Sequence, residues 1–201
     1  MAIEQKFRKF GESAIASYNF TDIAEGTGIV TLYAFGNAAS GAYQYSLTGQ
    51  EIRSFEIESV KTIPAAVFTF DSSVFNYPRI AKGTAMVRFS SDSYNSGGGH
   101  TIYWNIKIQK VSNGVITTLG NADSASSTVG GGHNLISWTV TIVLTQTNFK
   151  IGDQLRLLMT AGGNGDVTLG HDPADRDGST ITPSSTYPTK LEFYMPFKID
   201  I

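Results

Sequence analysis

The chain has 201 residues, of which 41% are hydrophobic, and its 15 basic and 17 acidic side chains give a formal charge of −2. This length suits one domain with a full core, and no apolar run approaches the ~20 residues of a membrane span, so we expect no membrane partner. The charges are scattered singly, which argues against nucleic acid as a partner. Cysteine is absent, which excludes disulfides, thiolate nucleophiles and Cys-ligated zinc.

The first 25 residues are expected to form an N-terminal arm and a first strand, ahead of one sandwich domain over residues 26–201. Ile3, Phe7 and Phe10 recur at near-helical spacing among basic residues. Because a helix this short is unstable alone in water, we expect these residues either to pack on a neighbouring molecule or to form a loose terminus. The charged start lacks the apolar segment of a signal peptide, so none is expected.

Apolar and polar residues alternate through much of the chain, which is the period-two pattern of strands with one buried face. Pro196, in the last such run, has no N–H to donate, so that strand should lie at a sheet edge or carry a bulge. The expected strands cover residues 14–20, 28–35, 43–47, 55–57, 67–70, 85–89, 102–108, 115–119, 136–144, 155–159 and 191–201.

The connections between these runs indicate how the strands pair. Asn113-Gly114 is a strong signal for a tight hairpin. The polar connection between residues 136–144 and 155–159 is too long for one, so those strands should lie in different sheets. The polar tract 90–99 is expected between strands. About ten short strands without a convincing internal helix predict an all-β, antiparallel two-sheet sandwich of jelly-roll type.

Two groups of residues are candidate metal ligands. His100 and His133 each end a Gly-Gly-Gly-His segment, a repeat that hints at internal duplication, and the two could bind one metal ion or be plain loop residues. Asp172, Asp175 and Asp177 offer the oxygen ligands that calcium uses, without the spacing of an EF-hand, and such residues also build simple turns. We expect no cofactor, with calcium at these aspartates as the alternative.

No sequence motif indicates a catalytic chemistry. The chain has no Gly-x-Ser-x-Gly, His-Glu-x-x-His or P-loop pattern, so we predict no catalytic residue and no enzyme. Tyr103 shares a polar strand face with amide side chains, and Tyr94 and Tyr187 are expected in loops. Because aromatic rings beside hydrogen-bonding groups can stack on sugars, Tyr94 and Tyr103 are candidate sugar-binding residues in an alternative function.

Several segments resemble the jelly-roll virion proteins of tailed bacteriophages. Phe-Lys-Ile-Gly-Asp-Gln-Leu-Arg-Leu at 149–157, Gly-Gly-Asn-Gly-Asp at 162–166 and Leu-Gly-His-Asp-Pro at 169–173 resemble their C-terminal half. Residues 16–35 are similar to their N-terminal signature, and residues 83–89 match in order and spacing. The resemblance covers most of the chain and brings no catalytic residue with it.

The resemblance implies a non-enzymatic virion structural protein located on the capsid surface. Such a decoration or cement protein would bind the outside of the major capsid shell, with the major capsid protein and further copies of the chain, as a homotrimer, as its partners. Ile3, Phe7, Phe10 and Tyr187 would then contact those neighbours. The alternative implied function is a carbohydrate- or receptor-binding module of a phage tail fibre or spike.

Overall fold

The computed structural model describes residues 27–37, 44–51, 61–64, 66–171, 175–176, 187–188 and 190–198. Every regular element in these residues is a strand, which confirms the predicted all-β sandwich class. No helix capable of crossing a membrane occurs in this part of the chain. The strands are β1 (Thr27–Asn37), β2 (Gln44–Thr48), β3 (Lys61–Thr62), β4 (Val67–Ser72), β5 (Arg79–Asn95), β6 (His100–Ser112), β7 (Val115–Asp123), β8 (Ser127–Val129), β9 (Gly132–Phe149), β10 (Gln154–Gly163), β11 (Asp166–Gly170), β12 (Asp175–Arg176), β13 (Tyr187–Pro188) and β14 (Glu192–Lys198).

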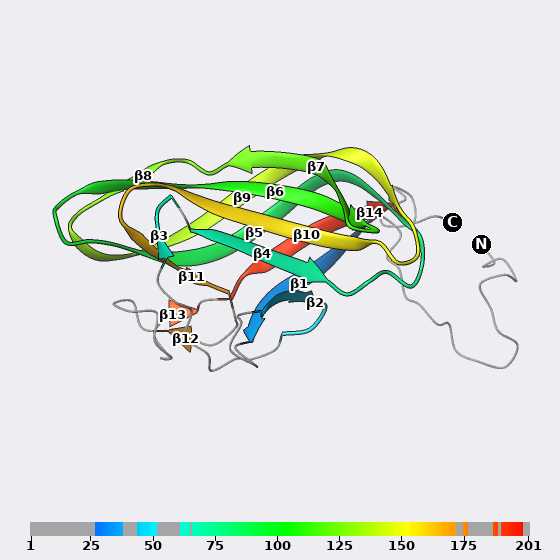
Figure 1. Ribbon diagram of the computed structural model, residues 1–201, viewed down its shortest axis with the longest axis horizontal. Helices are drawn as coiled ribbons and strands as arrows, with labels where there is room; N and C mark the ends of the chain where they lie inside the picture. Colours follow the sequence, from blue (N-terminus) through cyan, green and yellow to red (C-terminus); the bar gives the residue numbers. More distant parts are fainter. Residues whose placement is uncertain are drawn as a thin grey trace, which may run out of the picture.

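The strands form one large sheet that folds over itself into two layers. Its order is β3-β11-β5-β14-β1-β2-β4-β10-β6-β7, with β9 added on β5 and β8 on β6, while β12 and β13 form a separate pair. Strands β4, β10 and β6 lie side by side across β5, β9 and β14 (Figure 1). Strand β2 joins the layers by pairing antiparallel with β1 and parallel with β4. This parallel pair departs from the wholly antiparallel arrangement that the sequence predicts.

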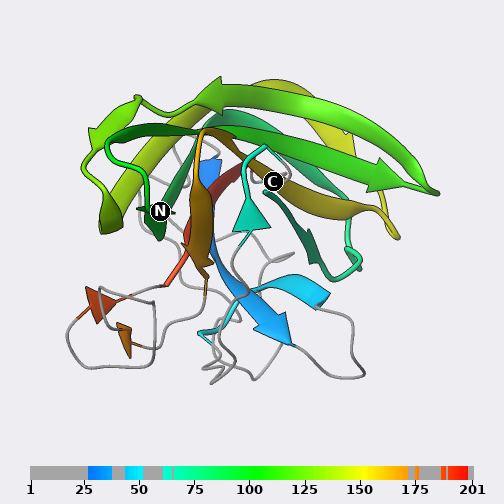
Figure 2. The same cartoon turned by 60° about the vertical axis from the view of Figure 1, so that its left-hand side comes forward.

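Strand β9 pairs with β5, whereas β10 pairs with β4 and β6. The prediction that these two consecutive strands lie in different layers is therefore confirmed. Figure 2 shows the two layers from a second direction, with β11 beside its partner β3. Strand β11 and strand β14 pair with different halves of the same strand, β5. Strand β5 is thus held on both sides along much of its length.

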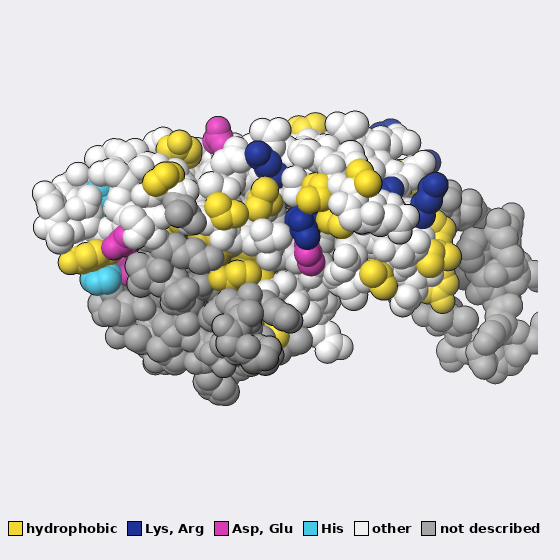
Figure 3. Space-filling model, in the orientation of Figure 1, with side chains coloured by type: hydrophobic (Ala, Val, Ile, Leu, Met, Phe, Trp, Pro, Cys, Tyr) yellow, Lys and Arg dark blue, Asp and Glu magenta, His cyan; other side chains and the backbone are white. Residues whose placement is uncertain are grey.

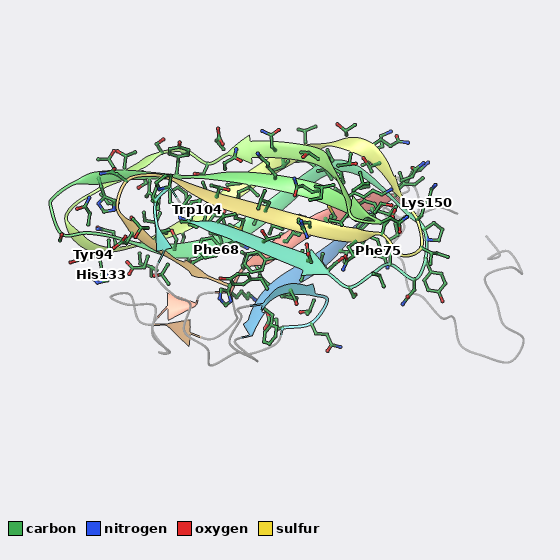
Figure 4. All side chains as sticks on the ribbon, in the orientation of Figure 1. Phe68, Phe75, Tyr94, Trp104, His133 and Lys150 are labelled. Atoms are coloured by element: carbon green, nitrogen blue, oxygen red, sulfur yellow. The ribbon has the colours of Figure 1, made fainter. Side chains whose placement is uncertain are left out.

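The core is filled by alternate apolar side chains from both layers. Trp104 of β6 is fully buried, with its ring centroid 5.2 Å from Phe89 of β5 and 5.8 Å from Phe68 of β4. Phe89 in turn stacks on Trp138 of β9 at 6.3 Å. These rings join the two layers, and Figure 4 shows Phe68 and Trp104 in the middle of the sandwich. Both tryptophans occupy the core face that the alternation predicts.

Local geometry confirms two predictions from single residues. Asn113 and Gly114 both have positive φ, 48° and 79°, as a type I′ hairpin between β6 and β7 requires. Strand β14 lies between β1 and β5 rather than at an edge, and its register on β5 shifts between Tyr194 and Phe197, on either side of Pro196. A bulge thus accommodates the missing N–H of the proline, which was one of the two expected outcomes.

Only the last part of the tract 90–99, residues 96–99, lies between strands, and the rest of the prediction is wrong. Strand β5 continues to Asn95, and Ser91, Asp92 and Ser93 are among its most buried residues, with at most 3% exposure. The polar side chains are accommodated because β9 and β11 flank this half of β5 and provide cross-strand partners. The prediction was wrong because a polar composition was taken to mean solvent exposure.

Candidate acid–base site

The two Gly-Gly-Gly-His segments meet at one end of the sandwich. A Cβ added at Gly131 would lie 3.2 Å from the Cα of Gly98, so the two glycine segments pack backbone against backbone. A side chain at Gly131 would make a tighter contact than most Cβ atoms make, so the facing backbone would have to move. Strand β6 begins at His100 directly after one segment, and His133 is the second residue of β9 after the other. Both imidazoles therefore lie next to the C-terminal end of β5.

Neighbouring residues of β5 bind the two histidines on opposite faces of the sheet. Side chains alternate along a strand, so Asp92 and Ser93 point to opposite sides. Asp92 accepts a hydrogen bond from His133 on the outer face, whereas Ser93 bonds His100 on the core face. The structure therefore brings both predicted histidines to β5 but separates them by the thickness of the sheet.

The outer pair has the geometry of an acid–base dyad. His133 Nδ1 lies 2.7 Å from Asp92 Oδ2, and the side chain of Asp92 is 4% exposed while that of His133 is 39% exposed. Since an ionised carboxylate can only accept, the proton of the neutral ring lies on Nδ1 and Nε2 carries the free lone pair. No hydrogen bond joins Nε2 to another residue of the described chain.

Tyr94 fixes the plane of the imidazole. Its ring centroid lies 4.6 Å from that of His133, with 33° between the planes, and the two residues are direct cross-strand partners. Figure 4 shows both rings together at the end of the sandwich, away from the buried Trp104. The ring contact and the Asp92 hydrogen bond hold the imidazole at two points, so its orientation is set before any ligand arrives.

Burial of Asp92 alters its electrostatics. Removal from water raises the pKa of Asp92. The hydrogen bond from His133, the positive charge of that ring when it is protonated, and hydrogen bonds from the Asn134 and Ser93 backbone oppose the rise. The second carboxylate oxygen, Oδ1, is buried and has no partner among the described residues. Leaving a buried carboxylate oxygen unpaired costs free energy.

The loop before His133 is held by its neighbour. The Asn134 amide donates to the carbonyls of Gly130 and Gly132, at 3.0 and 3.1 Å. Gly132 has a φ of +88°, a conformation that other residues adopt only with strain. The two hydrogen bonds from the Asn134 side chain restrain the conformational freedom that these glycines would otherwise give to the backbone at His133.

The inner pair differs in its access to water. Ser93 Oγ lies 2.6 Å from His100 Nε2, and His100 is 3% exposed. The other ring nitrogen, Nδ1, is buried without a partner among the described residues. A ligand has no route to this imidazole in the described chain, so it contributes to packing. Since the two histidines face opposite ways and no group of three metal-binding side chains occurs in the described ranges, they do not fit a shared metal site.

The other predicted site residues do not gather at this end. Tyr103 lies on β6, where its ring covers Gly162 of β10, so it belongs to the opposite layer from Tyr94 and the two form no common platform. Several predicted residues lie outside the described residues, or have side chains outside them: Ile3, Phe7, Phe10, Asp172, Asp175, Asp177 and Tyr187. Asp175 and Tyr187 are described only as parts of β12 and β13.

Comparison with known proteins gives the fold a context. No protein-family model and no curated protein sequence matches the chain. It is similar in structure to an aminopeptidase from the marine sediment archaeon Thaumarchaeota archaeon, with a TM-score of 0.51 and 12% identity over 87% of this chain and 37% of that one. A weaker likeness is to a CocE/NonD family hydrolase from Staphylococcus aureus, with a TM-score of 0.48 and 10% identity over 86% of this chain and 36% of that one. Another is to an α-amino acid ester hydrolase, with a TM-score of 0.49 and 13% identity over 84% of this chain and 35% of that one.

These structures correct the predicted function. The chain spans about a third of the length of each of these hydrolases, and at such identities the likeness shows the fold alone. The predictions of a non-enzymatic capsid decoration protein, and of a phage tail-fibre module, are nevertheless contradicted, because the fold matches part of a hydrolase, the archaeal aminopeptidase. The resemblance to phage proteins and the capsid partners, homotrimer and virion location derived from it stay untested predictions.

Proposed function

We propose that the chain is the β-sandwich domain of a hydrolase and that Asp92 and His133 form an acid–base pair acting on an ester or amide. The observation that carries the proposal is the dyad itself: a buried carboxylate orients an imidazole whose other nitrogen is open to solvent. Hydrolytic sites commonly contain a nucleophile, a base that removes its proton, and a further group that orients the base. Here His133 would be the base and Asp92 the group that orients it. The fold likeness to part of an aminopeptidase supports the same class of chemistry.

The dyad would act on water as the nucleophile. No Ser or Thr hydroxyl is bonded to His133 Nε2 in the described residues, and cysteine is absent from the chain. Nε2 removes a proton from a water molecule as its oxygen attacks the carbonyl carbon, and the imidazolium then returns that proton to the leaving oxygen or nitrogen as the old bond breaks. Asp92 keeps the proton on Nδ1 and stabilises the imidazolium between the two transfers.

The test is turnover of a neutral activated ester and an amino acid anilide by the full chain. General acid–base catalysis contributes typically about 10²–10⁴-fold, so His133→Gln should lower kcat/KM by at least about 10²-fold and Asp92→Asn should lower kcat at nearly unchanged KM. Thr141→Ala, an exposed change on the same strand, is the matched control. A hydrolysis rate that saturates with substrate concentration would show that substrate binds at a site, because a free imidazole catalyses without saturation.

Two results would overturn the proposal. One is a rate with no saturation that does not exceed that of free 4-methylimidazole at equal concentration. The other is full activity in folded His133→Gln. Circular dichroism and the urea midpoint of each variant establish that the sandwich is intact, so a loss of activity is not mistaken for a loss of fold.

A further inference from the structure

The end of the sandwich opposite the dyad is built from three loop tips. Residues 73–78 join β4 to β5, residues 112–115 form the hairpin between β6 and β7, and residues 150–153 join β9 to β10. Phe75 N donates to Asp153 O at 2.8 Å and Gly152 N to Phe75 O at 2.9 Å, which ties the first loop to the third. We call the surface formed by these tips and the adjoining ends of β5, β7 and β14 the basic end.

Exposed apolar side chains concentrate at the basic end. The described chain exposes nine large hydrophobic residues, and five of them lie here. Tyr77 and Ile151 are 74% and 70% exposed, at the tips of two loops. The five residues are Val74, Tyr77, Val115, Ile116 and Ile151. Single exposed apolar residues are common, but a group on neighbouring loop tips indicates a contact surface.

Cations surround these apolar tips. Lys82, Lys150 and Lys198 are exposed there, and Arg79 packs its guanidinium over Phe75 at 5.2 Å and Phe197 at 5.3 Å. The carboxylate of these turns, Asp153, is already paired with Lys110 at 2.8 Å. Figure 3 shows Lys and Arg side chains gathered toward this end, and Figure 4 places Phe75 and Lys150 there.

We propose that the basic end docks on the surface of an anionic lipid bilayer. Separate apolar tips ringed by lysines fit a bilayer interface, where tyrosine and aliphatic side chains enter the headgroup region while lysines remain at the phosphates. Such a contact lies on the membrane surface, so it does not require the apolar segment of ~20 residues that would span the bilayer.

The experiment measures co-sedimentation of the full chain with phosphatidylcholine vesicles, with and without about 30% phosphatidylserine. We expect binding to the anionic vesicles, weakened by high salt. The test variant is Ile151→Ser with Lys150→Gln, and the matched control is Val67→Ser with Lys107→Gln, which changes one apolar residue and one lysine away from the basic end. A lysine near an anionic surface is worth about fivefold in partitioning, so the test variant should lose at least about tenfold and the control less than about twofold.

Several outcomes would overturn the proposal. Equal binding to neutral vesicles would remove the role of charge, and equal losses in the two double variants would remove the role of the basic end. Absence of binding by the wild-type chain would end the proposal directly. Concentration-dependent dimerisation that the test variant abolishes, without lipid binding, would assign the surface to a second copy of the chain.

Discussion

Asp153 offers a sharp test of how a buried charge stabilises the sandwich. It follows the turn between β9 and β10 and is 3% exposed. Its Oδ2 accepts hydrogen bonds from the Lys150 backbone N–H at 2.6 Å and from Lys110 Nζ at 2.8 Å. Lys110 also donates to Asn148 O at 2.7 Å. The carboxylate thus joins the end of β6 to the turn, and Asp153→Asn removes its charge with little change of shape.

The magnitude follows from the pKa of Asp153. Burial raises this pKa, but hydrogen bonds from Lys110, Ser112 and the Lys150 N–H outweigh burial and lower it from 3.8 to about 2. Such a lowering corresponds to at most about 2.4 kcal/mol. Since Lys110 is partly exposed and solvent screens the pair, we expect a loss of about 1–2 kcal/mol for Asp153→Asn at neutral pH.

The direction of the Asp153 pKa shift gives a second, pH-dependent test. A carboxyl with a depressed folded pKa stabilises the fold fully above its unfolded pKa, and this contribution disappears as pH falls from about 4 toward 2. Urea unfolding followed by circular dichroism should therefore separate wild type from Asp153→Asn at pH 7 and bring them together near pH 2. Asp123→Asn, at an exposed position on β7, is the control and should change stability by less than about 0.5 kcal/mol. Equal midpoints at pH 7, or a difference of the same size at both pH values, would refute the reasoning.

Two further predictions concern the tryptophans of the core and Gly163 at the end of β10. Trp138 Nε1 donates to Ser91 Oγ at 2.8 Å, whereas Trp104 Nε1 is buried without a partner among the described residues, so Trp138→Phe should cost about 1 kcal/mol more than Trp104→Phe in urea unfolding. The reverse order would contradict this assignment. A Cβ at Gly163, whose φ is +109°, would lie 1.9 Å from Thr101 O, so Gly163→Ala should lose about 3 kcal/mol or more, while Gly130→Ala, with open space around it, should change little. Similar melting temperatures for the two alanine variants would show that the backbone relaxes.

The elements that the sequence predicts well are those with local causes. The alternation around Trp104 identifies β6, and Asn113-Gly114 predicts its hairpin, because both signals depend on neighbouring residues only. The pairing of β2 with β4 in parallel has no such local signal, since it depends on how the whole sheet closes. The extension of β5 through Asp92 was missed for the same reason, as its partners come from β9 and β11, far away in the sequence.

The sequence identified the histidines of the candidate site but not their partners. The repeated glycine segments drew attention to His100 and His133, and the structure places both against β5. Their partners, Asp92 and Ser93, could not be identified without the register of β5, because a shift of one residue exchanges the two faces. The alternation of side chains along β5 also explains why the two histidines face opposite sides of the sheet and do not fit a shared metal site.

The length of β5 has a geometric consequence for the two ends of the molecule. Its 17 residues run from Arg79 at the basic end to Asn95 beside the dyad. At a rise of about 3.3 Å per residue, the ends are about 50 Å apart. A molecule standing upright on lipid would thus hold His133 far above the headgroups, in bulk water. The imidazole would there meet dissolved molecules arriving by diffusion, and an acyl chain still embedded in the bilayer would be out of its reach.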